Sequence, residues 1–301
     1  MRTKRPCTGV LWSVILAIVG LTWPADTLRG IEPPIPLVQV GDVPMELRER
    51  LRLDPFYRKH ADAEGLPILS SEKVSDEALR EAAYLINQML ADRDDLRRAL
   101  IEGKVRCAVM APTEMTTDVP EHADLRPKDY WDRRARGLGA TRWRPAVSCG
   151  EENLLNLKGD RYPQENILIH EFAHVIHEMG LNVIDDEFDG RLLKSYQQAM
   201  ENGLWKETYA ATNHKEYWAE GVQSYFDTNA PPGGVHNDVN TREKLGRYDP
   251  DLFRLIDEAF RKPAWRYVRY DDRSRIRKKS DSLEAGERKV PSSPSKSDSS
   301  R

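Results

Sequence analysis

Cysteine is scarce in this chain of 301 residues, which contains Cys7, Cys107 and Cys149. None of them belongs to a CxxC pair, so the sequence does not support a metal site built on thiolates. If the chain is exported and Cys7 is lost with a leader, an oxidising compartment would permit Cys107 and Cys149 to form a disulfide. Both also suit the interior as small apolar residues, and the sequence leaves the two interpretations open.

An excess of positive charge is also missing. The chain has 46 Lys and Arg against 49 Asp and Glu, a formal net charge of -3. We therefore expect no nucleic-acid partner, because binding to a phosphate backbone depends on an excess of basic side chains. No glycine-rich loop precedes a helix, so Gly137 and Gly139 are interpreted as turn residues and not as a phosphate cradle.

A long uncharged run occurs near the start, where residues 10–23 follow Arg2, Lys4 and Arg5. At about 1.5 Å per residue this run is too short for a hydrocarbon core of roughly 30 Å. Residues 1–25 are therefore predicted to be a signal peptide or a short uncleaved anchor. The protein is expected to be secreted, periplasmic or on the cell surface, with membrane contact only through an uncleaved N-terminal segment.

Composition divides the remaining chain into three parts. Prolines recur across residues 26–45, which predicts an extended linker. Residues 271–301 combine charge runs and serines with almost no large apolar side chain, so they are predicted to form a disordered tail in which Arg273 is solvated. The stretch 46–270 is long enough for one large folded domain with an N-terminal helical part.

The first half of that domain is expected to contain helices and one strand. A short helix broken near Pro55 precedes an amphipathic helix, for which Ser75 is the predicted N-cap, and a shorter helix that ends near Gly103. Residues 104–112 alternate apolar and polar positions and are predicted to form a strand.

The second half is expected to be mostly helical. Residues 114–146 are rich in glycine and proline and indicate irregular loops, and residues 147–157 an edge strand or an extended segment. Helical spacing dominates from residue 163 onward. The predicted fold class is therefore α+β, mainly helical, with a small sheet.

The sequence HEFAH at residues 170–174 matches the pattern HExxH within an apolar helical run. His170 and His174 are four residues apart, so their imidazoles lie one turn above the other and both can bind one Zn²⁺ at about 2.0 to 2.1 Å. Glu171 would lie beside the ion and take a proton from a water that the metal polarises. Without a metal, burial of these polar side chains would be costly.

A third protein ligand must come from another part of the chain, because catalytic zinc generally has three. His177 is about 10.5 Å along the helix axis from His170 and is interpreted as a helix-face residue. A second helical stretch, residues 208–227, carries Glu216 and Glu220 on one face. One of these carboxylates would complete the zinc site and the other would accept a hydrogen bond from a ligating histidine, and spacing alone does not assign the two roles.

HEFAH together with the downstream pattern from Tyr209 to Glu220, YAATNHKEYWAE, resembles the anthrax lethal factor-like catalytic domain. That family belongs to the gluzincins, zinc peptidases whose third ligand is a glutamate. The resemblance implies a zincin-like fold, Glu216 as the zinc ligand, Glu220 as a supporting residue and Tyr209 as the donor that stabilises the transition state. Tyr217 is the alternative donor. The resemblance covers residues 165–226, with a looser match over 75–157.

These observations predict a metallohydrolase that holds one Zn²⁺ per chain and cleaves a peptide or protein substrate. Two alternatives remain: a zinc amidase acting on a non-protein amide, and a zinc-stabilised binding domain without turnover. Glu171 argues against the binding domain, because a structural site has no use for an acid beside the metal. Glu151, Glu152 and Asn153 either contact the substrate or satisfy a turn, and His236 is interpreted as a loop histidine.

Overall fold

The computed structural model describes residues 38–275. In this part of the chain a six-stranded sheet has the order β1-β2-β3-β4-β6-β5. Its strands are β1 (Gly41–Asp42), β2 (Lys59–Ala63), β3 (Leu66–Ser70), β4 (Arg106–Met110), β5 (Gly137–Leu138) and β6 (Ala146–Gly150). Strands β3, β4 and β6 are parallel, whereas β1, β2 and β5 pair antiparallel with their neighbours. The sheet is therefore mixed, and β5 lies at one edge.

Helices account for most of the remaining secondary structure. The first group is α1 (Met45–Leu51), α2 (Asp76–Met89), α3 (Asp94–Glu102), η2 (Thr116–Asp118), η3 (Pro120–His122), α4 (Lys128–Arg134) and α5 (Glu151–Leu154). The second group is α6 (Ile167–Val175), η4 (Ile176–Leu181), α7 (Asn182–Ile184), α8 (Phe188–Glu201), η5 (Tyr209–Ala211), α9 (His214–Tyr225), α10 (Arg242–Tyr248) and α11 (Pro250–Ala259). The predicted α+β class with a small sheet is confirmed.

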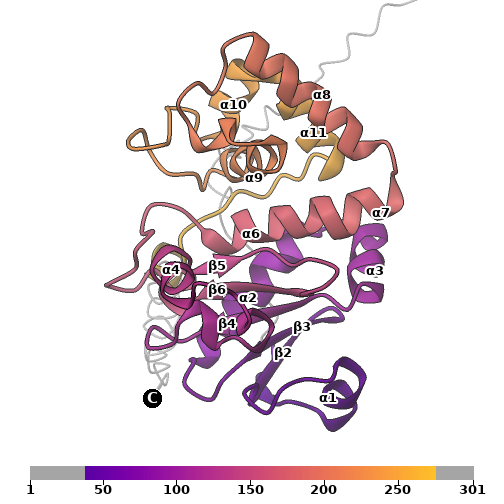
Figure 1. The fold of residues 1–301 in the computed structure, drawn as a ribbon, viewed down its shortest axis with the longest axis vertical. Helices are drawn as coiled ribbons and strands as arrows, with labels where there is room; N and C mark the ends of the chain where they lie inside the picture. Colours follow the sequence, from indigo (N-terminus) through magenta and orange to yellow (C-terminus); the bar gives the residue numbers. More distant parts are fainter. Residues whose placement is uncertain (1–37, 276–301) are drawn as a thin grey trace, which may run out of the picture. The chain divides into compact units, whose positions relative to one another are not determined.

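Both faces of the sheet are covered. Helices α2 and α6 pack on one face (Figure 1). On the other face, α1 and the turns around it bury a cluster of Leu47, Leu53, Tyr57, Leu69, Ala108, Met110 and Val119. This explains why every residue of β4 and β6 is buried. The alternation seen across residues 104–112 therefore does not mark a solvent-exposed face.

A second helical layer packs on α6 from the side opposite the sheet (Figure 1). It consists of α8, α9, α10 and α11. The fully buried Trp218 of α9 donates from Nε1 to the Ala173 carbonyl oxygen of α6 at 2.9 Å, and its ring packs against Phe188 and Phe260. Helix α6 is thus shared between the sheet and this second layer.

Local signals explain the best-predicted helices. Ser75 caps α2, with its side chain accepting a hydrogen bond from the Ala78 backbone N–H, and the helix begins at Asp76 as expected. Helix α3 ends at Glu102 and is followed by Gly103, also as expected. The predicted helix before Pro55 corresponds to α1, but it ends at Leu51 and β2 begins at Lys59.

Several predictions for residues 114–157 were wrong. Helix α4 lies within the stretch expected to be loops. Gly137 belongs to β5, where its backbone pairs with Cys149, and is not a turn residue. Strand β6 lies between β4 and β5, so it is not an edge strand.

The ends of the domain differ from the expected boundaries. Within the predicted linker, Gly41 and Asp42 form β1 and pair with β2. Residues 271–275 are helical, and Arg273 forms an ion pair with Glu81 and lies 4.3 Å from the Tyr84 ring centroid, so this arginine is not solvated. The predicted leader, most of the linker and the rest of the tail lie outside the described residues. Within 38–275 no helix has the length and apolar character needed to cross a membrane.

The structure shows Cys107 and Cys149 as free and buried. They lie on the neighbouring parallel strands β4 and β6, where Cys107 is aligned with Val147 and Cys149 with Val109. The two thiols therefore occupy diagonal positions. This arrangement agrees with the interpretation of both residues as small core side chains.

Candidate metal centre

The helix that carries HExxH is positioned from both ends. Asn166 caps α6 by accepting a hydrogen bond from the Ile169 backbone N–H at 3.0 Å. After Val175 the helix continues as the π-helical segment η4, so α6, η4 and α7 form one continuous helical run (Figure 1). His170, Glu171 and His174 all lie in the regular α6 part.

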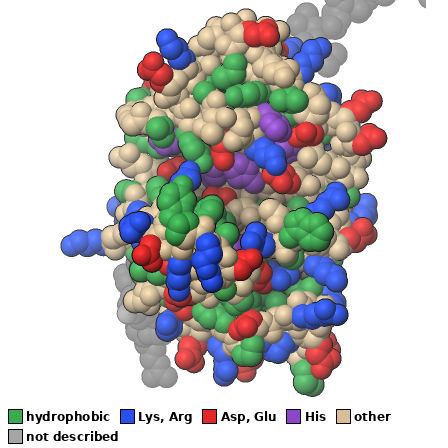
Figure 2. All heavy atoms as spheres, viewed as in Figure 1, with side chains coloured by type: hydrophobic (Ala, Val, Ile, Leu, Met, Phe, Trp, Pro, Cys, Tyr) green, Lys and Arg blue, Asp and Glu red, His purple; other side chains and the backbone are tan. Residues whose placement is uncertain are grey.

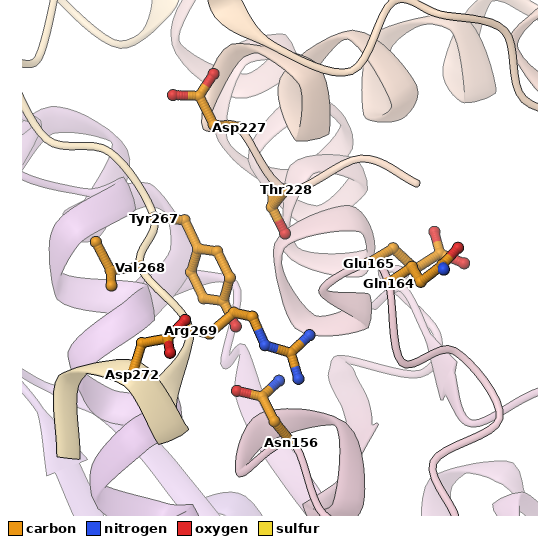
Figure 3. A pocket seen from close by; sticks show the side chains of 9 residues that line it. All are labelled: Asn156, Gln164, Glu165, Asp227, Thr228, Tyr267, Val268, Arg269 and Asp272. Carbon is orange, nitrogen blue, oxygen red and sulfur yellow. The ribbon is translucent and has the colours of Figure 1, made fainter. Parts of the chain in front are cut away.

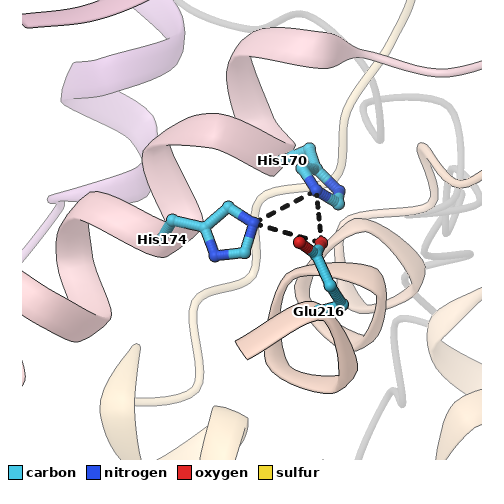
Figure 4. Close-up of side chains that lie close together, drawn as sticks. All are labelled: His170, His174 and Glu216. Atoms are coloured by element: carbon cyan, nitrogen blue, oxygen red, sulfur yellow. Dashed lines mark hydrogen bonds and ion pairs between the residues drawn. The ribbon is translucent and has the colours of Figure 1, made fainter. Parts of the chain in front are cut away.

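Glu216 reaches the same place from the second layer. Asn213 caps α9, and its side chain accepts hydrogen bonds from the backbone N–H groups of Lys215 and Glu216. The cap fixes the first helical turn, in which Glu216 lies. Because α9 packs across α6, this first turn faces the two histidines (Figure 4).

The structure brings His170, His174 and Glu216 together. His170 Nε2 lies 3.2 Å from His174 Nε2 and 3.2 Å from Glu216 Oε2, and His174 Nε2 lies 3.3 Å from Glu216 Oε2 (Figure 4). Tetrahedral zinc with ligands at about 2.0 to 2.1 Å requires ligand atoms about 3.3 Å apart. Three neutral or anionic donors at this spacing fit one face of such a tetrahedron, so the residues present suit a zinc ion.

The site is partly open to solvent. The side chains of His170, His174 and Glu216 are 10%, 15% and 18% exposed. In the space-filling view, histidine side chains are visible in a hollow across the middle of this face (Figure 2). The three side chains are therefore accessible from solvent in part.

Charges within the group are strongly coupled. Burial lowers the pKa of His170, but the carboxylates of Glu216, Glu171 and Glu220 outweigh it and raise that pKa to about 10. Burial raises the pKa of Glu216, but His170 and His174 hold it well below its usual range. Metal binding at these atoms therefore competes with a proton on the imidazoles.

Glu171 is held next to the edge strand. Burial raises its pKa, although His170 and His174 oppose this effect. A Cβ atom on Gly137 would lie 2.4 Å from Ile167 Cγ2 and 3.1 Å from Glu171 Cγ, and one on Gly139 would lie 3.2 Å from His174 Cβ. The two glycines thus permit close approach of β5 to α6.

Tyr209 lies at the site and Tyr217 does not. The Tyr209 ring centroid is 6.3 Å from that of His170, and burial together with the Glu216 charge raises the pKa of Tyr209 to about 12, so its hydroxyl remains a donor at neutral pH. Tyr217 is fully buried, and its hydroxyl bonds Asp249 at 2.7 Å and Ser195 at 3.1 Å in the second layer. The alternative donor is therefore remote from the metal ligands.

Gln223 is the residue that sequence reasoning missed. Its Oε1 lies 2.8 Å from His170 Nδ1, closer than the 3.8 Å from His170 Nδ1 to Glu220 Oε1. Gln223 Nε2 donates to Glu165 Oε2 at 3.2 Å and to the Asn166 carbonyl oxygen. Because the Gln223 amide N–H groups face these acceptors, Gln223 Oε1 must accept a hydrogen bond from His170 Nδ1–H. The proton of His170 is then on Nδ1, and His170 Nε2 is free to bind a metal.

Glu220, predicted to support a histidine, lies 3.8 Å from His170 Nδ1 and has closer partners. Its Oε2 accepts from Asn229 Nδ2 at 3.1 Å and lies 3.2 Å from His236 Nδ1. His236 is thus directed to Glu220 and does not join the metal-ligand group. Beyond Gln223, Glu165 lines a polar pocket of about 300 Å³ that is also bordered by Thr228, Tyr267 and Arg269 (Figure 3).

The residues after β6 serve the fold. Glu151 Oε1 accepts from the Ser75 backbone N–H, and Glu152 forms a buried ion pair with Arg136 at 2.6 Å. The Asn153 side chain accepts from the Ile167 N–H at the start of α6 and donates to the Glu165 carbonyl oxygen. All three are buried, which favours the turn interpretation over substrate contact.

No protein-family model matches the chain, and no curated protein matches it. Among solved structures, the chain is similar to the Pro-Pro endopeptidase from Paenibacillus alvei, with 19% sequence identity and a TM-score of 0.36. The match covers 66% of this chain and 98% of that chain.

Proposed function

We propose that this protein is a zinc-dependent metallopeptidase of the gluzincin type, with a zincin-like fold related to the lethal factor-like catalytic domain. The proposal rests on one observation: His170 Nε2, His174 Nε2 and Glu216 Oε2 form a triangle with sides of 3.2 to 3.3 Å. This triangle is the size of one face of a tetrahedral zinc site. A peptide or protein is the proposed substrate, cleaved at an internal peptide bond.

A zinc ion bound to these three ligands would polarise a substrate carbonyl and lower the pKa of water. Glu171 adjoins His170 in the sequence, and burial raises its pKa. A carboxylate with a raised pKa is suited both to take a proton from attacking water and to pass it to the leaving amine. Gln223 keeps the His170 proton on Nδ1 and so holds Nε2 in the ligating form.

Tyr209 supplies a hydrogen bond where negative charge develops. Its phenol stays protonated because burial and the Glu216 charge raise its pKa to about 12. A fixed hydroxyl donor beside a developing oxyanion stabilises the transition state more than the ground state. Tyr209 lies in η5, immediately before the helix that carries Glu216, so ligand and donor are positioned by the same segment.

Catalysis is favoured over a structural role by the number of ligands. Within residues 38–275 the metal-ligand group contains His170, His174 and Glu216 and no fourth His, Cys, Asp or Glu. Structural zinc sites are usually closed by four protein ligands, whereas catalytic sites keep one position for water or substrate. We further propose that the enzyme acts after export, since the uncharged run at residues 10–23 resembles a secretory signal.

The Glu171→Gln variant tests the proposal, with Glu178→Gln as the matched control. Glu178 lies in η4, pairs with Lys215 at 2.8 Å and is not part of the metal-ligand group. Each protein is loaded with zinc, its metal content is measured, and cleavage of an unbiased peptide library is recorded with and without chelator. We expect Glu171→Gln to retain one zinc per chain and to lose cleavage, while the control retains both.

Two results would contradict the proposal. One is wild-type protein that binds one zinc and cuts no peptide in the library. The other is unchanged cleavage by Glu171→Gln, which would show that the buried carboxylate takes no part in proton transfer. Loss of zinc from Glu171→Gln would instead assign that residue to the metal site.

A further inference from the structure

Helix α4, which the sequence did not predict, ends beside the metal centre. Its last turn is fixed by side chains from the loop before α6. The Tyr162 hydroxyl donates to the Arg134 carbonyl oxygen at 2.5 Å, and Arg161 Nη1 donates to the carbonyl oxygens of Asp132 and Arg133. The position of Arg134 is therefore set by several backbone contacts.

The Arg134 side chain points to the transition-state donor. Its Nη1 donates to the Tyr130 hydroxyl at 2.9 Å, and its guanidinium carbon lies 5.9 Å from the centroid of that ring. Its Nη2 lies 3.5 Å from the Tyr209 hydroxyl. Tyr130 thus supports a cationic group that borders the atoms proposed to carry out the reaction.

Arg134 differs from its neighbour Arg136 in how its charge is balanced. Arg136 is buried and forms an ion pair with Glu152. Arg134 is exposed, and within residues 38–275 no carboxylate lies within ion-pair distance of it. The charge of Glu216 acts on Arg134 electrostatically from beyond that distance. A bound metal would be coordinated by the Glu216 carboxylate.

A guanidinium with free donors suits a carboxylate. Arginine carries five N–H donors in a planar fork that matches the two oxygens of a carboxylate. Tyr130 and Tyr209 engage at most two of the Arg134 donors. Basic side chains also gather along the rim of the hollow that holds the histidines (Figure 2).

We propose that Arg134 binds a carboxylate of the substrate next to the scissile bond, so that the enzyme prefers peptides with an acidic group at one defined position. This inference rests on the proposed peptidase function. The carboxylate is either an Asp or Glu side chain or the free C-terminus of a short peptide. Both present the same chemistry to the guanidinium, and matched substrates separate them.

The test uses peptides that the wild-type enzyme cleaves. Glu and Gln are exchanged at each position within three residues of the cleaved bond, and each peptide is made with a free and an amidated C-terminus. A hydrogen-bonded charge pair of this kind is expected to raise kcat/KM about tenfold or more at one position. A preference confined to the Glu series assigns a side chain, and one confined to the free acids assigns the C-terminus.

Variants then attribute the preference to Arg134. Arg134→Gln should lower kcat/KM for the acidic peptide about tenfold more than for its neutral partner, mainly through KM, and Arg134→Lys should restore part of the difference. Arg133→Gln is the matched control, because Arg133 is an exposed residue of α4 whose side chain makes no contact with Tyr209. It should retain the full preference.

A binding measurement tests the role of Arg134 independently of peptide cleavage. Labelled Glu and Gln peptides are titrated into zinc-loaded Glu171→Gln protein with and without Arg134→Gln. A ratio of dissociation constants near one in both proteins would overturn the inference even if the enzyme cleaves peptides. An equal fall in kcat for acidic and neutral substrates in Arg134→Gln would overturn it too, because Arg134 would then act by positioning Tyr209. If the acidic peptide binds more tightly through Arg134 but nothing is cleaved, the proposed function fails and the anion site stands.

Discussion

Two clusters, each of two imidazoles and one acid, form where the helical run α6–η4 meets α8 and α9, and they differ in geometry. In the first, His170, His174 and Glu216 place three ligand atoms within 3.3 Å of one another. In the second, Asp189 Oδ1 lies between His177 Nε2 at 2.9 Å and His214 Nε2 at 3.1 Å. The ring centroids of His177 and His214 are 6.0 Å apart, and the metal-ligand group within 38–275 consists of the first set. Two imidazoles and an acid therefore make a metal site only when all three converge.

The pKa of a histidine is shifted in opposite directions in the two clusters. Surrounding carboxylates raise the pKa of His170 to about 10. Burial lowers the pKa of His177 to about 4, although Asp189 opposes this. His177 is fully buried and partly surrounded by the rings of Phe188 and Trp218. The first cluster attracts a cation, whereas the second holds a neutral ring in the core.

Removal of the shared acid should separate the clusters most clearly. Glu216→Ala takes away one of three ligands, so stoichiometric zinc binding and peptide cleavage should both be lost. Metal content after gel filtration measures the first and library cleavage the second. Asp189→Ala is the matched change in the second cluster and should keep one zinc per chain. Equal zinc content in both variants would contradict the assignment of Glu216 as a ligand.

Acidification should act through the second cluster. The folded-state pKa of His177 is about 4 and its ordinary value is 6.5, so the unfolded chain takes up a proton first as the pH falls. The corresponding stability is present above pH 6.5 and lost toward pH 4, on the order of 3 kcal/mol for the full shift. Thermal unfolding of chelator-treated protein at pH 7 and pH 4.5 measures it.

His177→Gln provides the control for this pH dependence. Its melting temperature should fall less between the two pH values than that of the wild type. Part of the fall will remain, since burial also lowers the pKa of His122 to about 4. Identical falls in both proteins would show that His177 does not titrate as proposed.

Loss of the Gln223 amide should weaken the first cluster without abolishing it. Gln223→Leu leaves His170 Nδ1 without its acceptor at 2.8 Å. Substitution of such supporting residues typically lowers metal affinity about 10- to 100-fold. Competition with a zinc indicator measures the change. Gln198→Leu, an exposed glutamine of α8 that pairs with Asn202, is the control and should leave zinc affinity unchanged.

The smallest expected effect is that of Asp189→Asn. The variant keeps the shape of the side chain and weakens the bonds to His177 and His214. A loss of about 1 kcal/mol in the free energy of unfolding is expected, with zinc affinity unchanged. Urea denaturation measures the first and indicator competition the second. A change in zinc affinity would show that the two clusters are coupled along the helix.

Much of the fold could be predicted from local signals. Helix α2 has a clear apolar period and a Ser75 cap, and both appear as expected. Helix α4 has no buried residue, so its sequence carries no apolar period that could reveal it. Strand β3, which contains Pro67, was not predicted from the sequence. All five of its residues are buried, so it lacks the alternation of apolar and polar residues that is typical of a half-exposed strand.

The candidate site was predictable where spacing alone determines the chemistry. His170 and His174 share a helix face at four-residue spacing, and the resemblance picked out Glu216 as their partner. Gln223 and Arg134 gave no such signal. Each makes a contact between segments far apart in the sequence, Gln223 with His170 and Arg134 with Tyr209. Neither residue type is specific enough to indicate such a contact before the fold is known.

The placement of the ligands on two layers has a mechanical consequence. His170 and His174 belong to α6, which packs on the sheet. Glu216 and Tyr209 belong to the second helical layer, which packs on the opposite side of α6. An ion held by all three ligands would link the two layers, and a ligand that binds only the folded state raises the melting temperature, with a stabilisation that grows as the logarithm of its concentration relative to Kd. Zinc would then stabilise the contact between the two layers as well as support the proposed hydrolysis, and a chelator would weaken that contact.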